Sequence, residues 1–358
     1  SGMRQLMKGN DAIAEAAVRA GMRFFSGYPI TPQTEILEYL SKRLPEVGGT
    51  FVQTESEISG ISMVYGAAAT GFRTMTSSSG PGFSLLQEGI SYIASAELPC
   101  VIVDVMRYGT GLGDIFQAQG DYLQVVKNGG HGDYRCLVYA PSSVQEAADL
   151  MTLAFDKAEE HRNPVILLSD ASISQMMEPV ELPEMREHDP DQYQWSLKGR
   201  RSPEDFRRVT SNMYYIDDYD RYIQEKYQRI EEQEQRWQAV ETEDAEYVLV
   251  AYGISSRICK EAVRLGRSQG IKLGLIRPIT LYPYPVKAFE TCRNAKCFIS
   301  CELTPLAQMA EDVALAEGMQ KDVYAITGGM EVFDSKDILD EVARIAAGEK
   351  KAVYKGND

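Results

Sequence analysis

Histidine, tryptophan and closely paired cysteines are scarce in this sequence of 358 residues. Of its three histidines, His161 and His188 lie in polar segments, where we expect exposed side chains, and His131 lies in a glycine-rich loop that could approach a ligand. No two of the six cysteines form a C-x-x-C pair, so neither a zinc site nor an iron–sulfur cluster is predicted. Reduced core thiols are expected instead, which fits a cytoplasmic protein.

Several motifs that would define a function are also missing. No G-x-G-x-x-G follows the first expected strand and no G-x-x-x-x-G-K-[ST] occurs, so dinucleotide and P-loop sites are not predicted. No G-x-S-x-G is present, which argues against an α/β-hydrolase. The sequence has no apolar run of about 18 residues and no positively charged, then apolar, leader, so neither a membrane span nor export is expected.

The charge is strongly acidic. The chain has 37 basic and 52 acidic residues, a formal net charge of −15. Nucleic acids and anionic membranes are bound through basic surfaces, so neither is an expected partner. A local basic pocket for an anionic substrate stays compatible with this charge.

The first half of the chain alternates short apolar runs with helix-like segments. Six runs are predicted to be strands: residues 23–26, 50–54, 73–77, 100–106, 135–140 and 164–169. The run at 100–106 (CVIVDVM) is almost wholly apolar, as a strand buried on both faces should be. The alternation predicts an α/β domain with a doubly wound parallel sheet over residues 3–180.

Residues 181–245 are polar, charged and rich in tyrosine, and we interpret them as a linker. Residues 218–240 are predicted to form one long helix, which could pack on its own chain or on a partner subunit. Its expected apolar stripe is Tyr219, Tyr222, Ile223, Tyr227, Ile230 and Trp237. Residues 246–350 predict a second, smaller α/β domain with strands at 247–252, 271–276, 296–301 and 322–326, and helices that include 306–318.

Four turns of the first domain follow strands and should face the same edge of its sheet. They carry Thr31, Glu57, the Ser-Gly-Pro-Gly loop at 79–82, and Arg107. An acid, a cation, a hydroxyl and a glycine loop could form one small site. Arg107 directly follows an apolar strand, which suits a fixed guanidinium that binds a carboxylate through paired hydrogen bonds.

Each of these side chains also has a purely structural interpretation. Thr54 and Glu57 fit a capping box at the start of a helix. Arg107 could be a surface residue or an ion-pair partner of Glu57 or Asp114, and Thr31 could serve only to stiffen a turn or cap a helix. Local sequence does not choose between these interpretations.

Four stretches carry a resemblance to a known family: 27–32 (GYPITP), 53–66 (QTESEISGISMVYG), 78–84 (SSGPGFS) and 277–281 (RPITL). With them, almost the whole chain resembles the α-type subunit of 2-oxoacid:ferredoxin oxidoreductases, and residues 181–245 are the least characteristic part. Residues 65–69, 97–99, 101–107 and 127–132 look most like the branched-chain, 2-oxoisovalerate type. The 2-oxoglutarate type is the second most similar.

The resemblance implies a pyrimidine-side domain for thiamine diphosphate, followed by a domain similar to the transketolase C-terminal domain. Glu57, nine residues before Gly66, matches the family's cofactor glutamate. As a neutral carboxyl it would donate a hydrogen bond to the pyrimidine N1′ of the cofactor. Arg107 matches the arginine that holds the substrate carboxylate, and Thr31 matches a threonine that contacts substrate or cofactor.

The remaining expectations also come from the resemblance. Ile30, Gly80 and Pro81 should line the cofactor. The reaction would be oxidative decarboxylation of a branched-chain 2-oxoacid with coenzyme A, giving acyl-CoA and carbon dioxide, with ferredoxin as electron acceptor. A β-type subunit would share the cofactor. Magnesium and the 4Fe–4S clusters would belong to partner subunits, which also include a γ subunit and a ferredoxin-like δ subunit. Alone, the chain would be an inactive homodimer.

Three other functions stay open at this point. The substrate could be 2-oxoglutarate. The chain could be the β subunit of a 2-oxoacid dehydrogenase that passes its acyl group to lipoamide. It could also be a non-catalytic structural subunit that kept the fold, although the presence of Glu57 and Arg107 argues against that interpretation.

Overall fold

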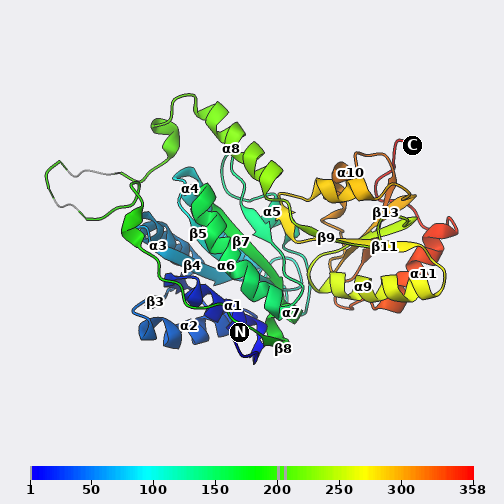
Figure 1. The fold of residues 1–358 in the computed structure, drawn as a ribbon, viewed down its shortest axis with the longest axis horizontal. Helices are drawn as coiled ribbons and strands as arrows, with labels where there is room; N and C mark the ends of the chain where they lie inside the picture. Colours follow the sequence, from blue (N-terminus) through cyan, green and yellow to red (C-terminus); the bar gives the residue numbers. More distant parts are fainter. Residues whose placement is uncertain (1, 200–201, 205–207) are drawn as a thin grey trace.

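Two open sheets, each covered by helices, lie side by side along the long axis of the molecule (Figure 1). The computed structural model describes residues 2–199, 202–204 and 208–358. The first sheet belongs to the amino-terminal half, and the second sheet to the carboxy-terminal part with helices α9, α10 and α11 (Figure 1). The α/β class expected from the sequence is confirmed.

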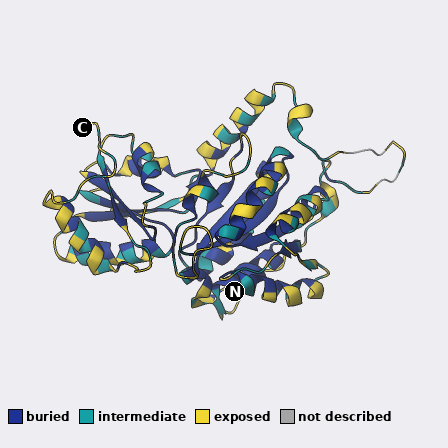
Figure 2. Ribbon diagram, turned by 180° about the vertical axis from the view of Figure 1, so that it is seen from behind, coloured by how far each residue is buried: buried dark blue, intermediate teal, exposed yellow. Residues whose placement is uncertain are grey.

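The first sheet has seven strands, and the pairs within it are parallel except at one edge. In spatial order its strands are β12 (Thr280–Tyr282), β6 (Leu137–Tyr139), β7 (Pro164–Asp170), β5 (Cys100–Met106), β4 (Arg73–Ser78), β2 (Met22–Gly27) and β3 (Thr50–Gln53). Every residue of the central strands β5 and β7 is buried, which explains their continuous apolar runs (Figure 2).

Helices cover both faces of this sheet, as a doubly wound fold requires. Helix α1 packs against both α2 and α6 in one layer, while α3 and α4 pack together, α3 on β2 and β4 and α4 on β4. The helices are α1 (Gly9–Arg19), α2 (Thr34–Glu46), α3 (Glu57–Ala69), α4 (Pro81–Ser95), α5 (Tyr122–Val126), α6 (Val144–His161) and α7 (Ala171–Gln175). A separate two-stranded ribbon, β1 (Gln5–Lys8) with β8 (Met177–Val180), joins the two ends of this unit.

The second sheet has five strands. In spatial order they are β14 (Asp322–Thr327), β13 (Cys297–Glu302), β10 (Tyr247–Val250), β11 (Leu273–Pro278) and β9 (Trp237–Val240). Its helices are α9 (Gly253–Ser268), α10 (Ala310–Ala316) and α11 (Ser335–Ala346). Short 3-10 helices lie in the preceding linker, η1 (Pro190–Gln192) and η2 (Asn212–Tyr214), and between β12 and β13, η3 (Val286–Thr291). The four predicted strands are present, but the helix predicted for 306–318 is limited to α10.

The prediction of one helix over residues 218–240 is wrong. Helix α8 covers Tyr219–Gln233, and Trp237–Val240 is strand β9, which pairs antiparallel with β11. Backbone groups of β11 at the edge of the second sheet pair with residues 237–240. The helical spacing of apolar residues does not predict this pairing. Of the predicted stripe, Ile230 is fully buried, while Tyr222 is 37% exposed.

A buried ion pair holds helix α8 against the loop that precedes β5 of the first sheet. Lys226, 2% exposed, donates to Glu97 at 3.0 Å, and Tyr222 donates to the same carboxylate. The interpretation of a connecting helix packed on its own chain therefore describes this side of α8. The opposite side of the helix is exposed (Figure 2).

Strands are exchanged between the two sheets. β12 comes from the carboxy-terminal part of the chain yet pairs with β6 of the first sheet, and β9 comes from the predicted linker yet pairs in the second. An ion pair adds to this connection: Arg277 donates from both terminal nitrogens to Glu146, at 2.6 and 2.9 Å. The two sheets are thus joined by backbone and side chain.

Two histidines differ from expectation. His161 is 5% exposed at the end of α6, where its ring lies 3.2 Å from Glu234, and the side chain of His188 is 7% exposed against Glu159. Both partners come from distant parts of the chain, so the polar local sequence was misleading. His131 is exposed, as predicted for a loop residue. Among the described residues, no helix is long and apolar enough to cross a membrane.

Candidate functional site

The predicted site residues follow the carboxyl ends of neighbouring parallel strands. β2, β3, β4 and β5 run in the same direction, so the turns after them meet at one edge of the first sheet. Thr31 follows β2, Glu57 follows β3, Gly80 follows β4 and Arg107 follows β5.

Glu57 is the first residue of α3, and its side chain is not used to cap that helix. The cap is Ser56, whose hydroxyl accepts from the Ser59 N–H at 3.3 Å, while Thr54 donates its hydroxyl to the Ser56 carbonyl. The capping-box interpretation is therefore wrong. Glu57 is 7% exposed, and within the described residues its carboxyl group forms no hydrogen bond or ion pair.

The glycine turn packs directly on this carboxyl group. A Cβ at Gly82 would lie 2.8 Å from the Glu57 carboxyl and 2.2 Å from the Ser78 hydroxyl, so only glycine leaves room here. Gly80 adopts a φ of 44°, which favours glycine, and Pro81 begins α4. The hydroxyls of Ser78 and Ser79 are buried and have no hydrogen-bond partner in the described part of the chain. Sequence reasoning treated the loop as a backbone element and missed these two hydroxyls.

Arg107 is 8% exposed and is held by backbone carbonyls. It donates from Nη1 to the Thr31 carbonyl at 3.1 Å and from Nη2 to the Leu112 carbonyl at 2.5 Å, and its Nε has no partner among the residues described. No carboxylate in the described ranges forms an ion pair with it, so the surface and ion-pair interpretations are wrong. Its charge remains available to an anionic ligand.

Thr31 follows β2, which lies in the sheet between β5, the strand before Arg107, and β3, the strand before Glu57. Thr31 does not cap a helix. Helix α2 has Gln33 at its cap position, and the Thr31–Pro32 peptide bond is cis. Thr31 is exposed and Ile30 is half-buried. The Gln33 side chain accepts from the Ser77 hydroxyl at 2.6 Å, which connects this turn to β4.

Two buried acids near the site were also missed. Asp104 on β5 is fully buried, and Asp121, just before α5, is 5% exposed and accepts from the Gly80 N–H at 3.2 Å. The available signal was the single charge of Asp104 within the apolar run 100–106. A buried acid without a cation partner is a marker of function more often than a core choice.

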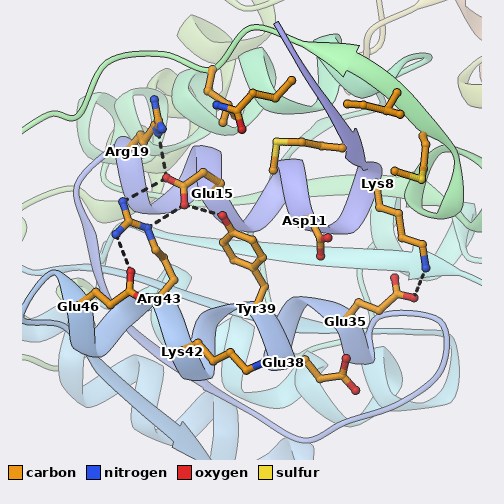
Figure 3. A pocket seen from close by; sticks show the side chains of 15 residues that line it. Lys8, Asp11, Glu15, Arg19, Glu35, Glu38, Tyr39, Lys42, Arg43 and Glu46 are labelled. Carbon is orange, nitrogen blue, oxygen red and sulfur yellow. Dashed lines mark hydrogen bonds and ion pairs between the residues drawn. The ribbon is translucent and has the colours of Figure 1, made fainter. Parts of the chain in front are cut away.

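A large hollow in the described surface lies elsewhere. It has a volume of about 1020 Å³ and lies between α1, α2 and the β1–β8 ribbon (Figure 3). Its charged groups mostly neutralise one another: Glu15 accepts from Arg19, Arg43 and Tyr39 (Figure 3). None of the predicted site residues lines this hollow.

Comparison with known proteins supplies the class. A family model described as pyruvate flavodoxin/ferredoxin oxidoreductase, thiamine diphosphate-binding, matches residues 15–247, and pyruvate:ferredoxin oxidoreductase core domain II matches residues 245–337. The fold and the edge of the first sheet thus define a thiamine-diphosphate-binding protein. Within that class, the chain belongs to the 2-oxoacid:ferredoxin oxidoreductase family, as the sequence predicted.

Curated relatives extend over the whole length. Ketoisovalerate oxidoreductase subunit VorB of Methanothermobacter thermautotrophicus is 48% identical over 348 residues, 96% of this chain and 98% of the relative. The 2-oxoglutarate synthase subunit KorA of Archaeoglobus fulgidus is 39% identical over 96% of this chain and 99% of its own length. Both are subunits of oxidoreductases, and this chain is likewise of subunit type.

Two solved structures share the fold. The 2-oxoglutarate:ferredoxin oxidoreductase of Magnetococcus marinus, with 2-oxoglutarate, coenzyme A and succinyl-CoA bound, has a TM-score of 0.83 at 25% identity. That similarity covers 96% of this chain, which spans 65% of the longer Magnetococcus chain. A split-gene transketolase, described as an inactive β4 tetramer, has a TM-score of 0.60 at 15% identity and supports the fold alone.

The site residues fit the pyrimidine half of thiamine diphosphate. Within the described part of the chain, Glu57 is a buried acid without a partner and Ser78 and Ser79 have unpaired buried hydroxyls, while Gly82 leaves a space that a Cβ would fill. Such unpaired polar groups at a ligand edge are costly unless a ligand pairs with them.

Proposed function

We propose that this chain is the α-type subunit of a thiamine-diphosphate-dependent oxidoreductase that converts branched-chain 2-oxoacids and coenzyme A into acyl-CoA and carbon dioxide, with ferredoxin accepting the electrons. The observation that carries the proposal is the Glu57 carboxyl, buried beside Gly82 and without a partner among the described residues. A buried carboxyl without a partner is costly unless a ligand bonds to it.

Glu57 would hydrogen-bond to the pyrimidine N1′ atom of the cofactor and exchange a proton with it. When bound, thiamine diphosphate supplies the electron sink for decarboxylation of the 2-oxoacid. Ile30, Thr31, Gly80 and Pro81 would line the same side of the cofactor. The glycine turn keeps the backbone close to the Glu57 carboxyl.

Arg107 would bind the carboxylate of the 2-oxoacid. Two carbonyls fix its terminal nitrogens, so the side chain loses little conformational freedom when a substrate binds. Charge-assisted hydrogen bonds orient the substrate for reaction, and orientation lowers the barrier of the subsequent step. Thr31 would contact substrate or cofactor from the neighbouring turn.

The branched-chain substrate class rests on the relatives. The VorB subunits named for ketoisovalerate are 48–49% identical to this chain, compared with 32–39% for the KorA subunits named for 2-oxoglutarate. 2-Oxoglutarate remains the second candidate, because the solved Magnetococcus enzyme binds it. A second carboxylate on that substrate would require a second cation in the pocket.

Partner subunits would complete the site. Large apolar side chains are exposed around the edge that carries Glu57 and Arg107: Ile58, Leu85, Leu112, Ile115, Phe116 and Leu123, between 41% and 80% exposed. A patch of this kind is typical of a protein interface. We propose that a β-type subunit covers it and holds the cofactor diphosphate with magnesium.

The 4Fe–4S clusters, a γ subunit and a ferredoxin-like δ subunit complete the proposed assembly. All six cysteines of this chain are buried thiols, which supports cluster ligands elsewhere and a reducing, cytoplasmic location. The homodimer predicted for the isolated chain remains a proposal, which sedimentation would check.

The test is viologen or ferredoxin reduction by the reconstituted complex. The expected result is coenzyme A-dependent reduction with 3-methyl-2-oxobutanoate at a higher kcat/KM than with 2-oxoglutarate or pyruvate. A higher kcat/KM for 2-oxoglutarate would assign the second candidate. Acyl transfer to lipoamide in place of viologen reduction, or no turnover with any 2-oxoacid, would contradict the proposal.

A further inference from the structure

Two carboxyl groups lie directly behind the glycine turn of the site. Asp121 accepts from the Gly80 N–H at 3.2 Å, and Asp104 lies within hydrogen-bonding reach of Asp121. Both are almost completely buried, at 0% and 5% exposed for Asp104 and Asp121. Neither oxygen of Asp104 meets a donor from the rest of the described chain.

This arrangement requires a proton between the two acids. Two carboxylates in contact can only accept hydrogen bonds, so one must carry a proton for the pair to be bonded. Burial, and then the negative charge of Asp121, raises the pKa of Asp104 well above its ordinary range. Burial also raises the pKa of Asp121, but hydrogen bonds from Asp104 and Gly80 and the charge of Arg107 oppose that shift. The two carboxyl groups therefore share one proton.

The segment that carries Asp121 is attached to the second sheet. Gln119 is fully buried and its side chain accepts from the Ser255 hydroxyl at 2.6 Å and from the Leu303 N–H at 3.1 Å. It also donates to the Tyr252 carbonyl at 2.9 Å. These bonds fix the backbone two residues before Asp121.

A second set of bonds holds the other side of Asp121. The Gly120 carbonyl accepts from the Gln308 side chain at 2.9 Å, and the Tyr122 hydroxyl donates to Asp312 at 2.5 Å. Residues 119–122 are thus held on both sides by the carboxy-terminal part of the chain. Because the Gly80 N–H bonds to Asp121, the position of residues 119–122 determines the position of Gly80 in the site.

The Gly80 turn in turn contacts both predicted functional side chains. A Cβ at Gly80 would lie 3.4 Å from Cγ of Arg107, and Gly82, two residues further on, packs on Glu57. A displacement of the turn therefore changes the position of the guanidinium and of the carboxyl together.

We propose that Asp121 is a positioning residue: placed by the second sheet through Gln119 and bonded to the Gly80 N–H, it sets the Gly80 turn between Glu57 and Arg107. This inference rests on the proposed function for its effect on turnover, but not for its effect on the turn. It gives the carboxy-terminal part of the chain a role in the site that it does not touch directly.

The charged and titratable groups around the pair are few in the described part of the chain. Arg107 faces Asp121 from the end of β5, and Tyr252 faces both acids from the start of α9, with Asp170 and Glu302 around Tyr252. Loss of the proton shared by Asp104 and Asp121 at alkaline pH would place two negative charges side by side and loosen the turn.

The experiment uses the reconstituted complex with four variants: Asp121→Leu, Asp104→Leu, Asp104→Asn and, as a control on an exposed acid, Asp133→Leu. Two readouts are taken: KM and kcat for the 2-oxoacid, and hydrogen-exchange protection of the peptide that contains Gly80. Asp121→Leu and Asp104→Leu should raise KM roughly 5- to 30-fold, the effect of one lost buried hydrogen bond, and lower the protection. Asp104→Asn, whose amide still donates to Asp121, should resemble the wild type, as should Asp133→Leu.

The pH dependence separates positioning from a merely structural role. In the wild type the protection of the Gly80 peptide should fall at alkaline pH, whereas Asp104→Asn should keep it constant; this comparison also holds if the leucine variants fail to assemble. Wild-type KM and protection in Asp121→Leu, or the same alkaline loss in Asp104→Asn, would overturn the inference. A complex that lacks 2-oxoacid turnover but shows the predicted exchange pattern would instead contradict the proposed function alone.

Discussion

Arg107 donates from Nη1 to the main-chain carbonyl of Thr31 at 3.1 Å. The bond connects the turn after β5 with the turn after β2, although β4 lies between these strands in the sheet. It fixes one side of the guanidinium through backbone, and among the described residues no carboxylate forms an ion pair with the guanidinium. This relationship is the basis of the proposed substrate contact.

Replacement of Glu57 by glutamine should abolish most turnover without unfolding the chain. Glutamine keeps the shape of the side chain but cannot transfer a proton, and loss of general acid–base catalysis typically costs about 10²- to 10⁴-fold in rate. Viologen reduction by the reconstituted complex measures the loss, and a thermal melt checks the fold. Glu55→Gln, an exposed acid two residues earlier, is the matched control and should be neutral. Retention of most activity in Glu57→Gln would remove this residue from the mechanism.

Replacement of Arg107 by alanine should weaken substrate binding. A charge-assisted hydrogen bond contributes about 1.5–3 kcal/mol, so KM for the 2-oxoacid should rise by about 10- to 150-fold. Arg107→Lys should recover only part of this, because an ammonium group cannot form the paired bonds. Steady-state kinetics give KM, and Arg221→Ala, with a side chain 73% exposed, is the control. An unchanged KM would place the substrate carboxylate elsewhere.

Substitution of Gly82 by alanine should displace Glu57 and lower thiamine diphosphate affinity. The new methyl group would lie 2.8 Å from the Glu57 carboxyl and 2.2 Å from the Ser78 hydroxyl. Overpacking of this kind costs about 1–3 kcal/mol, or roughly 5- to 150-fold in affinity if the cofactor contact is lost. Gly66→Ala on α3 is the control, since nothing lies within 4 Å of its Cβ position. Calorimetric titration of the cofactor into the complex decides, and equal affinities for the two variants would contradict the model of the site.

Removal of the Arg277 side chain should destabilise the junction of the two sheets. Arg277 and Glu146 have side chains 6% and 22% exposed, so Arg277→Ala leaves a largely buried carboxylate unpaired. A loss of about 2–4 kcal/mol is expected in the free energy of unfolding, near the lower end of values for buried pairs. Arg264→Ala breaks the exposed pair with Glu261 and should cost much less, because solvent screens an exposed pair. Denaturant titration measures both, and similar losses would show that the junction does not depend on this pair.

Stability should fall as pH rises from 4.5 to about 7, and Glu302 should account for part of the fall. Burial raises the pKa of Glu302 from 4.5 to about 7, with Met309 N–H and Ser300 hydroxyl bonds opposing the shift. Because the folded state binds the proton more tightly than the unfolded state, this contribution is complete below pH 4.5 and is lost by pH 7 and above.

Glu302→Gln should flatten this dependence, since its amide does not titrate yet still accepts from the Met309 N–H. Free energies of unfolding at pH 5 and pH 8 should differ less in the variant, by up to about 3 kcal/mol. Glu331→Gln, an exposed acid, is the control. An identical pH dependence in wild type and Glu302→Gln would mean that Glu302 is ionised throughout.

The sequence by itself determined the α/β class, the parallel strands and the edge at which Thr31, Glu57, Gly80 and Arg107 follow strand ends. Hydrophobic periodicity is a local property, and parallel pairing then brings the carboxyl ends together without further information. The family was likewise readable from short motifs in these turns.

Only the tertiary structure decided which partners these side chains have. The Glu57 side chain does not cap α3, because Ser56 does. Asp121 accepts from Gly80, 41 residues away in the sequence, and Arg277 binds Glu146, 131 residues away. Trp237–Val240 became an edge strand because the second sheet offered it a neighbour, β11. Such contacts depend on where distant segments meet in three dimensions. Local patterns of residues do not predict which distant residues will be in contact.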